Sequence, residues 1–249
     1  MIDLYYGPTA NCRKVSIMLE ETGLPYTLHA MDMLAGDQLK PDYLAVNPNN
    51  KIPAIVDRDG PGGQPVTIWE SGAILIYLAE KTGRFLPADP GRRIHCLQWL
   101  MFQMAGIGPM FGQWVHFNQY APEPIPYAVE RYRREIDRLR LVVDGRLADH
   151  RYLVDEYSIA DIACWPWLQS FRTRLPPAVP TPHLDAWADR IAERPAAMRG
   201  LQLLADRVRP EAKGEKPVDA HTWNVLYGTM QHGERYRDPA SETRGDARS

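Results

Sequence analysis

Short apolar runs and amphipathic stretches alternate along the first third of the chain. Residues 2–6 and 25–30 are typical of strands, and between them Val15, Met18 and Leu19 recur at helical spacing. The stretch between the two runs is long enough for a crossover that joins parallel strands. The pattern therefore predicts a β-α-β unit, with the helix ending near Gly23.

A second group of predicted elements completes this half of the chain. It contains a weak helix, two strands joined by a glycine-rich hairpin loop, and a buried helix that Ser71 can cap, at residues 38–46, 51–57, 64–69 and 70–81. The glycines of the loop open no helix, which excludes a nucleotide-binding loop. The order β-α-β-α-β-β-α is typical of a thioredoxin-like domain, which we place at residues 1–84.

Beyond a proline-containing link, apolar positions keep helical spacing as far as residue 208. Pro109 should kink or break the long segment 92–120. Ser158 and Asp161 have the spacing of a capping-box variant. Further amphipathic helices are predicted at residues 126–149, 183–194 and 195–208. We therefore expect an all-helical second domain at residues 91–208.

The last part of the chain, residues 209–249, is polar and charged, and we expect it to be partly disordered. Within it, Trp223, Val225, Leu226, Tyr227 and Met230 are too apolar for a simple linker. This cluster predicts that residues 221–230 dock on the body of the protein or on a partner.

Composition narrows the class of protein. Lysine and arginine number 29 against 31 aspartates and glutamates, so no strongly basic face is implied and a nucleic-acid-binding protein is disfavoured. The three cysteines, Cys12, Cys96 and Cys164, are too scattered for a disulfide framework or a metal site. The longest apolar run, residues 72–79, is too short to cross a membrane. We expect a cytoplasmic protein without a metal cofactor.

The turn at residues 7–12 carries the first candidate chemistry. It joins a strand to a helix, so Thr9 to Cys12 should lie at a helix N-terminus, where free N–H groups and the helix dipole favour a thiolate. A simpler interpretation is that Thr9 or Asn11 caps the helix. Cys12 stands where a Cys-x-x-Cys motif has its second, more buried thiol, so we interpret it as core-facing and not as a nucleophile.

Three strings of residues stand out between residues 1 and 208: Asn50 to Pro53, Glu70 with Ser71, and Ser158 to Asp161. Together they resemble the glutathione transferase superfamily over this range. A closer similarity to the nu class, the bacterial group that includes glutathione-dependent disulfide-bond reductases, is carried by residues 8–11, 47–55, 78–83, 122–127 and 163–167. The resemblance implies a thioredoxin-like glutathione-binding domain followed by an all-α domain.

The resemblance also assigns the residues around the cysteinyl part of glutathione. Thr9 and Asn11 match the residues that the family places beside the sulfur, where they help to lower the pKa of the thiol. The peptide bond before Pro53 is implied to be cis, and the backbone of Ile52 to pair with the cysteinyl backbone as an edge strand would.

The two ends of glutathione are assigned in the same way. Glu70 and Ser71 match the pair that holds the γ-glutamyl end, where a helix N-terminus can accept a carboxylate. Gln38 and Lys51 match positions near the glycyl end. Arg131 matches an arginine that reaches glutathione from the second subunit of a homodimer.

Three functions remain open at this point. The first is reduction of disulfides by the thiolate of bound glutathione, with two glutathione molecules or the oxidised dimer in each site. The second is conjugation or β-aryl ether cleavage of aromatic substrates, in a pocket of Trp114, Phe117, Tyr120 and the patch around Trp223. The third is a non-catalytic regulatory protein that keeps only the fold.

Overall fold

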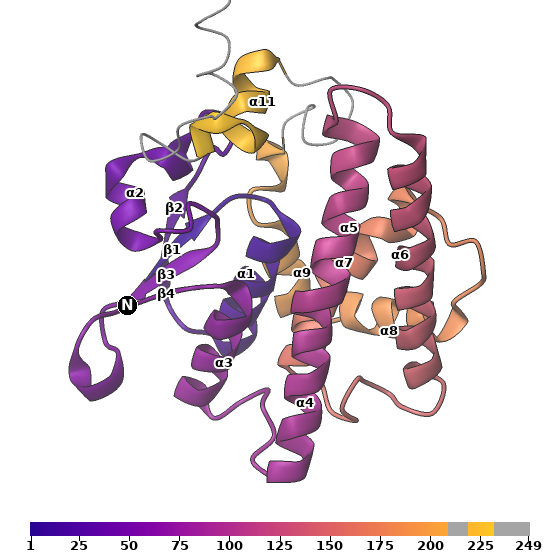
Figure 1. The fold of residues 1–249 in the computed structure, drawn as a ribbon. Helices are drawn as coiled ribbons and strands as arrows, with labels where there is room; N and C mark the ends of the chain where they lie inside the picture. The colour runs from indigo at the N-terminus through magenta and orange to yellow at the C-terminus, as the bar shows by residue number, and fades with distance from the viewer. Residues whose placement is uncertain (209–218, 232–249) are drawn as a thin grey trace, which may run out of the picture.

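The computed structural model of the protein describes residues 1–208 and 219–231. Figure 1 shows a small sheet with its helices on one side of the molecule and a bundle of helices on the other. The predicted fold class, a thioredoxin-like part followed by an all-helical part, is confirmed.

Four strands form one mixed sheet in the order β2-β1-β3-β4. The strands β1 (Ile2–Tyr6) and β2 (Tyr26–Ala30) are parallel, with Ile2 opposite Tyr26, which confirms the β-α-β prediction. The strand β3 (Ala54–Asp57) runs antiparallel to β1 and to β4 (Val66–Trp69). The segment before β3 therefore reaches the end of the sheet where β1 also ends.

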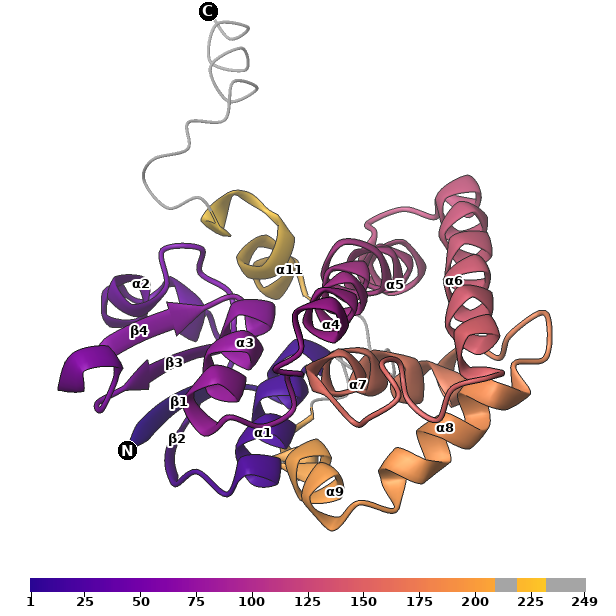
Figure 2. The ribbon, with the colours of Figure 1, turned by 90° about the horizontal axis from the view of Figure 1, so that it is seen from below.

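The helices of the sheet part are α1 (Ala10–Thr22), α2 (Pro41–Val46) and α3 (Ser71–Thr82), with short 3-10 turns η1 (Asp37–Leu39) and η2 (Pro61–Gly63). Figure 2 shows α1 and α3 between the sheet and the bundle. The N-termini of these two helices thus lie beside the joint between the two parts of the molecule.

The predicted long segment is a rod of two helices, α4 (Pro90–Phe102) and α5 (Gly108–Val115), joined by a π-helical turn η3 (Gln103–Ile107). Pro109 has no N–H to donate to the preceding turn, so the backbone widens there and the rod continues. The remaining elements are η4 (His116–Tyr120), α6 (Pro126–Leu147), α7 (Ile159–Arg174), α8 (Pro182–Ala192), α9 (Pro195–Gln202), η5 (Ala205–Arg207) and α11 (Ala220–Tyr227).

Close contact between α1 and α9 fixes the joint. The hydroxyl of Ser16 donates to the carbonyl of Gly200 at 2.7 Å. A Cβ atom at Gly200 would lie 2.5 Å from the backbone of Ile17, so only glycine allows the two helices to approach this closely. The hydroxyl of Tyr6 also crosses the joint and donates to the carbonyl of Leu203 at 3.0 Å. These contacts hold the turn before α1 in a fixed place.

Candidate functional site

The turn between β1 and α1 is built around Thr9. Thr9 has extended backbone angles and is the N-cap of α1, and its Oγ1 accepts a hydrogen bond from the backbone N–H of Cys12 at 3.3 Å. The capping interpretation is therefore correct for Thr9. The side chain is exposed, and its hydroxyl hydrogen remains able to donate to a ligand at the helix N-terminus.

Cys12 lies in the core, as the sequence predicts. Its thiol is fully buried, and desolvation raises its pKa to about 11. Cys96 and Cys164 are buried as well. None of the three protein thiols is placed to act as a thiolate nucleophile near neutral pH.

Asn11 is oriented by the helical part of the molecule. The indole Nε1 of Trp167 on α7 donates to Asn11 Oδ1 at 3.0 Å. Because the amide oxygen is occupied by this donor, the NH₂ group of Asn11 is left as the group that can face a ligand. A side chain at the start of α1 is thus held in place by a residue 156 positions later in the chain.

The segment before β3 has a cis peptide bond between Ile52 and Pro53. Tyr43 Oη and Asn47 Nδ2 each donate to the carbonyl of Lys51 at 2.6 Å, which holds this segment in place. The backbone N–H and C=O of Ile52 form no hydrogen bond to any part of the chain that the structure describes. They are available to pair with an extended peptide.

The prediction that Ile52 belongs to an edge strand is wrong. The edges of the sheet are β2 and β4, whereas β3 pairs on both sides. Ile52 precedes β3, and its backbone groups are left unpaired among the described residues because the strand has not yet begun there. The predicted peptide-pairing position lies just before an inner strand.

Ser71 does not cap α3, which corrects a second prediction. The N-cap is Glu70, whose φ is 73°, and its side chain makes no capping hydrogen bond. A positive φ at a residue other than glycine costs about 1–3 kcal/mol, and such strain concentrates at binding sites. The carboxylate of Glu70 is exposed, while Ser71 is the first residue of α3 and is buried.

Lys14 is a residue of this region that the sequence analysis did not single out. Its side chain is only 1 % exposed, and its Nζ donates to Ser71 Oγ at 3.3 Å and to Gln103 Oε1 at 2.5 Å. Burial lowers the pKa of Lys14 to about 7. A signal was present, because Lys14 lies on α1 among the apolar residues Val15, Ile17 and Met18.

The residues predicted near the glycyl end lie on two adjacent segments. Gln38 in η1 is buried, and its Oε1 has no hydrogen-bond partner among the described residues. The ammonium of Lys51 donates to Gln231 Oε1 at 2.7 Å, and Asn50 Nδ2 donates to the carbonyl of Gln231 at 2.7 Å. A segment from the end of the chain therefore covers the two residues before Ile52.

This covering segment, residues 219–231, contains α11. Both views place α11 between the sheet part and the end of the α5 rod (Figure 1, Figure 2). Trp223 Nε1 donates to the carbonyl of Tyr120 at 2.9 Å, and the ring of Tyr227 lies 4.7 Å from the ring of His116. Val225 is buried beside Gly36 of the sheet part. The segment thus contacts both parts of the molecule above the predicted site.

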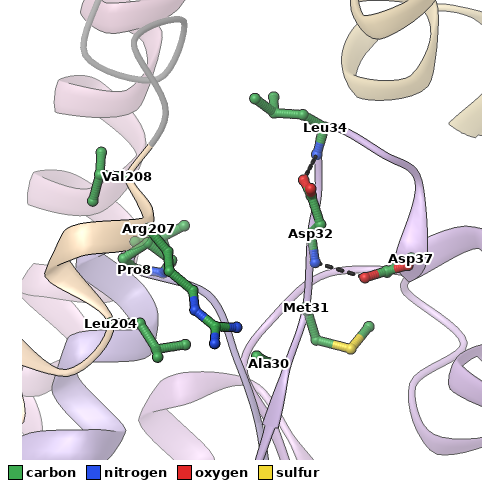
Figure 3. A pocket seen from close by; sticks show the side chains of 10 residues that line it. Pro8, Ala30, Met31, Asp32, Leu34, Asp37, Leu204, Arg207 and Val208 are labelled. Atoms are coloured by element: carbon green, nitrogen blue, oxygen red, sulfur yellow. Dashed lines mark hydrogen bonds between the residues drawn. The ribbon is translucent and has the colours of Figure 1, made fainter.

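A cavity of about 380 Å³ lies beside Thr9 (Figure 3). Its walls come from the β1-α1 turn, the chain after β2 and the chain after α9, and most of them are apolar: Pro8, Ala30, Met31, Leu34, Leu204 and Val208. Figure 3 shows the guanidinium of Arg207 between Leu204 and Met31. This cavity can hold a second substrate next to a sulfur at Thr9.

The aromatic residues after the π-helical turn do not line one pocket. Trp114 and Phe117 border a separate cavity of about 640 Å³ between α5 and α6, and the ring of Phe117 stacks on Tyr132. Tyr120 instead contacts Tyr227 of α11. These aromatic residues contact different parts of the molecule because successive helical positions face different neighbours.

Arg131 does not join the other predicted residues within one chain. It is exposed on α6, which Figure 2 shows on the side of the α4-α5 rod that is remote from the sheet. Its predicted role requires a second subunit.

Residues 1–208 and 219–231 lack two further features. These residues contain no group of three or more histidine, cysteine, aspartate or glutamate side chains that could hold a metal ion. They also contain no helix long and apolar enough to span a bilayer.

Comparison with protein families agrees with this geometry. Residues 10–81 match the model of the glutathione S-transferase N-terminal domain, and residues 111–195 match that of the C-terminal domain. The first match contains Asn11, Lys51, Ile52, Glu70 and Ser71.

Comparison with individual proteins points the same way. Over 81 % of its length the chain is 49 % identical to the disulfide-bond oxidoreductase YfcG of Escherichia coli K12, of which it covers 94 %. It is 41 % identical to the disulfide-bond oxidoreductase YghU of the same organism, covering 80 % of this chain and 73 % of that protein.

Solved structures of bacterial proteins resemble most of this chain. A glutathione transferase from Pseudomonas putida with one glutathione disulfide per subunit superposes with a TM-score of 0.77 at 45 % identity, covering 82 % of this chain and 91 % of that one. A family member from Pseudomonas fluorescens with two glutathione molecules bound has the same TM-score at 46 % identity, covering 80 % of this chain and 92 % of that one.

Proposed function

Because the chain belongs to the glutathione S-transferase family, we propose that it binds glutathione and uses the thiolate of glutathione to reduce disulfide bonds. We place it in the nu class, as a cytoplasmic homodimer in which Arg131 of one subunit reaches the site of the other. The similarity to two disulfide-bond oxidoreductases and to transferases that hold glutathione or its disulfide supports this proposal.

One observation carries the choice of a glutathione thiolate over a thiol of the protein. The turn at the start of α1 is a site for a thiolate, yet Cys12 is buried with its pKa raised to about 11. The reactive sulfur must therefore come from a ligand. Thr9, the NH₂ of Asn11 and the N-terminus of α1 supply the donors that stabilise it.

The remaining predicted residues position the rest of glutathione. The free backbone groups of Ile52 pair with the cysteinyl residue, and Ser71 with the first turn of α3 receives the γ-glutamyl carboxylate. Glu70 faces the ammonium of the same residue. Gln38 and Lys51 lie at the glycyl end, where a cation and an amide suit a carboxylate.

The reaction is two successive thiol–disulfide exchanges. The bound glutathione thiolate attacks one sulfur of the disulfide, a new S–S bond forms, and the other sulfur leaves as a thiolate. A second glutathione thiolate then attacks the glutathione sulfur of the mixed disulfide and releases the remaining thiolate. Glutathione is oxidised to its disulfide, the substrate is reduced to two thiols, and each leaving thiolate takes a proton from water.

The direct test is reduction of hydroxyethyl disulfide by glutathione, followed through glutathione reductase and NADPH. We expect turnover well above the uncatalysed exchange and dependent on glutathione. No turnover above the uncatalysed rate, in a protein shown to be folded, would contradict the proposal.

Cys12→Ala should leave this activity within about twofold of the parent protein, because the buried thiol forms no thiolate at neutral pH. The measurement is kcat/KM for glutathione in the same assay. Cys164→Ala is a matched control, since it also removes a buried thiol. A loss of more than about tenfold for Cys12→Ala alone would show that Cys12 is the nucleophile.

The cavity beside Thr9 supports a second candidate function. Its apolar walls suit an aromatic electrophile, which a glutathione thiolate at Thr9 would attack. Turnover of chlorodinitrobenzene or of a β-aryl ether well above disulfide turnover would favour conjugation or ether cleavage over disulfide reduction. Undetectable glutathione affinity by calorimetry would instead favour a non-catalytic regulatory protein.

Gln231→Ala should tighten glutathione binding about threefold, because it frees the Lys51 ammonium for the glycyl carboxylate. The measurement is the Kd for glutathione by calorimetry. Gln64→Ala, which removes an exposed amide from the hairpin loop, should change nothing. Weaker binding by Gln231→Ala would mean that the residue contacts glutathione and does not compete with it.

A further inference from the structure

The Lys14 ammonium is buried where α1, α3 and the π-helical turn η3 meet. Its nearest polar partners are Ser71 Oγ at 3.3 Å, Gln103 Oε1 at 2.5 Å and Met104 Sδ at 3.5 Å, all of them uncharged. A buried cation without an ionic partner is costly, and hydrogen bonds to neutral groups offset that cost only in part. An anion near Lys14 would therefore be stabilised.

Ser71 connects this cation to the surface of the site. Its Oγ accepts from Lys14, so its hydroxyl hydrogen must point elsewhere, and its other partner among the described residues is the weak acceptor Met104 Sδ at 3.7 Å. Ser71 is also the first residue of α3, where unpaired N–H groups carry positive potential. The charge of Lys14, the hydroxyl of Ser71 and the N-terminus of α3 therefore all favour an anion at the start of α3.

We propose that Lys14 is the counter-ion for the α-carboxylate at the γ-glutamyl end of glutathione, acting through the hydroxyl of Ser71. This proposal rests on the proposed function, since it requires glutathione to place that carboxylate at the start of α3. Lys14 is a positioning residue: it fixes the Ser71 hydroxyl as a donor and supplies charge to a ligand that it does not touch.

The surroundings of Lys14 couple its protonation to ligand binding. The titratable groups that act on it are the thiols of Cys12 on α1 and Cys164 on α7 and the carboxylate of Glu70. Burial raises the pKa of both thiols, so they are uncharged near neutral pH. With a pKa of about 7, Lys14 is mostly neutral at pH 8 in the free protein.

A bound carboxylate raises the pKa of Lys14 again, because it favours the charged form. Binding at pH 8 should therefore take up about one proton per site, and binding at pH 6 close to none. The affinity for the carboxylate should fall as the pH rises above the pKa of free Lys14.

The test is calorimetric titration of the full chain with S-methylglutathione in two buffers of different ionisation enthalpy. This ligand has no thiol, so no thiol proton is released. We expect proton uptake at pH 8 in the parent protein and none in Lys14→Met, which should bind about tenfold more weakly at pH 6. Lys14→Arg should bind without uptake, since arginine stays charged.

A ligand control isolates the carboxylate. The analogue of S-methylglutathione that has γ-aminobutyryl in place of γ-glutamyl lacks only the α-carboxylate. It should bind the parent protein without proton uptake. Ser71→Ala retains the lysine and should reduce the uptake seen with S-methylglutathione, which keeps the test decisive if Lys14→Met does not fold.

Binding of S-methylglutathione with no uptake at pH 8 in the parent protein, or with uptake unchanged in Lys14→Met, would overturn the role of Lys14. Equal uptake with the analogue that lacks the carboxylate would overturn it as well. Failure of the parent protein to bind S-methylglutathione at all would instead count against the proposed function.

Discussion

Asp161→Ala is expected to lower the free energy of unfolding by about 3–5 kcal/mol. Asp161 is fully buried in the capping box of α7. One carboxylate oxygen accepts from the backbone N–H of Leu153 at 3.0 Å and from Trp187 Nε1 at 2.9 Å, and the other accepts from Ser158 N at 3.0 Å and Ser158 Oγ at 3.1 Å. Alanine would leave these buried donors unsatisfied.

The measurement is urea unfolding followed by tryptophan fluorescence and circular dichroism. Asp161→Asn should cost less, because its amide oxygen can still accept from Leu153 and Trp187, although its NH₂ group would then face the N–H of Ser158. Asp149→Ala, at an exposed position, should stay within about 0.5 kcal/mol of the parent protein. A loss below about 1 kcal/mol for Asp161→Ala would mean that water or backbone movement satisfies the donors.

This aspartate shows how far local sequence signals reach. The spacing of Ser158 and Asp161 predicts the capping box, because that motif depends only on residues three positions apart. The bond from Trp187 comes from α8, 26 positions away, and no local pattern contains it. The strand pairing of β1 with β2 was predictable for a comparable reason, since crossover length and apolar spacing are both local.

The geometry around the candidate site residues was not predictable from local patterns. Serine is a common N-cap residue, which is why Ser71 was expected to cap α3. The N-cap is instead Glu70, whose backbone lies in the left-handed region. The hydroxyl oxygen of Ser71 accepts a hydrogen bond from Lys14. Lys14 bonds to Gln103, 89 positions away, across the joint between the two parts. Which face of α1 meets that joint depends on packing that periodicity does not encode.

The covering segment gives a similar contrast. The apolar cluster at residues 223–230 indicated that this part of the chain has a surface to bury, and Val225 is indeed buried beside Gly36. Gln231 gave no such signal, because a single glutamine is compatible with any exposed turn. Its contacts with Asn50 and Lys51 depend on where α11 ends.

Asn11→Asp is expected to lower kcat/KM for glutathione-dependent disulfide reduction about a hundredfold or more at neutral pH. The substitution changes almost no volume, and the carboxylate still accepts from Trp167 Nε1. It replaces the NH₂ donor by a negative charge beside the proposed thiolate, which raises the pKa of the glutathione thiol. The measurements are the pH profile of kcat/KM and the absorbance of bound thiolate near 240 nm.

The pH profile separates this electrostatic effect on the thiolate from a change in the shape of the binding site. If Asn11 stabilises the thiolate, the defect of Asn11→Asp should shrink as the pH rises toward the pKa of free glutathione, since the thiolate then forms without help. Trp167→Phe, which releases the amide of Asn11 but keeps its donor, should lose less activity and retain a lowered thiol pKa. A defect that stays constant over the whole pH range would place Asn11 in binding alone and leave Thr9 and the N-terminus of α1 to stabilise the thiolate.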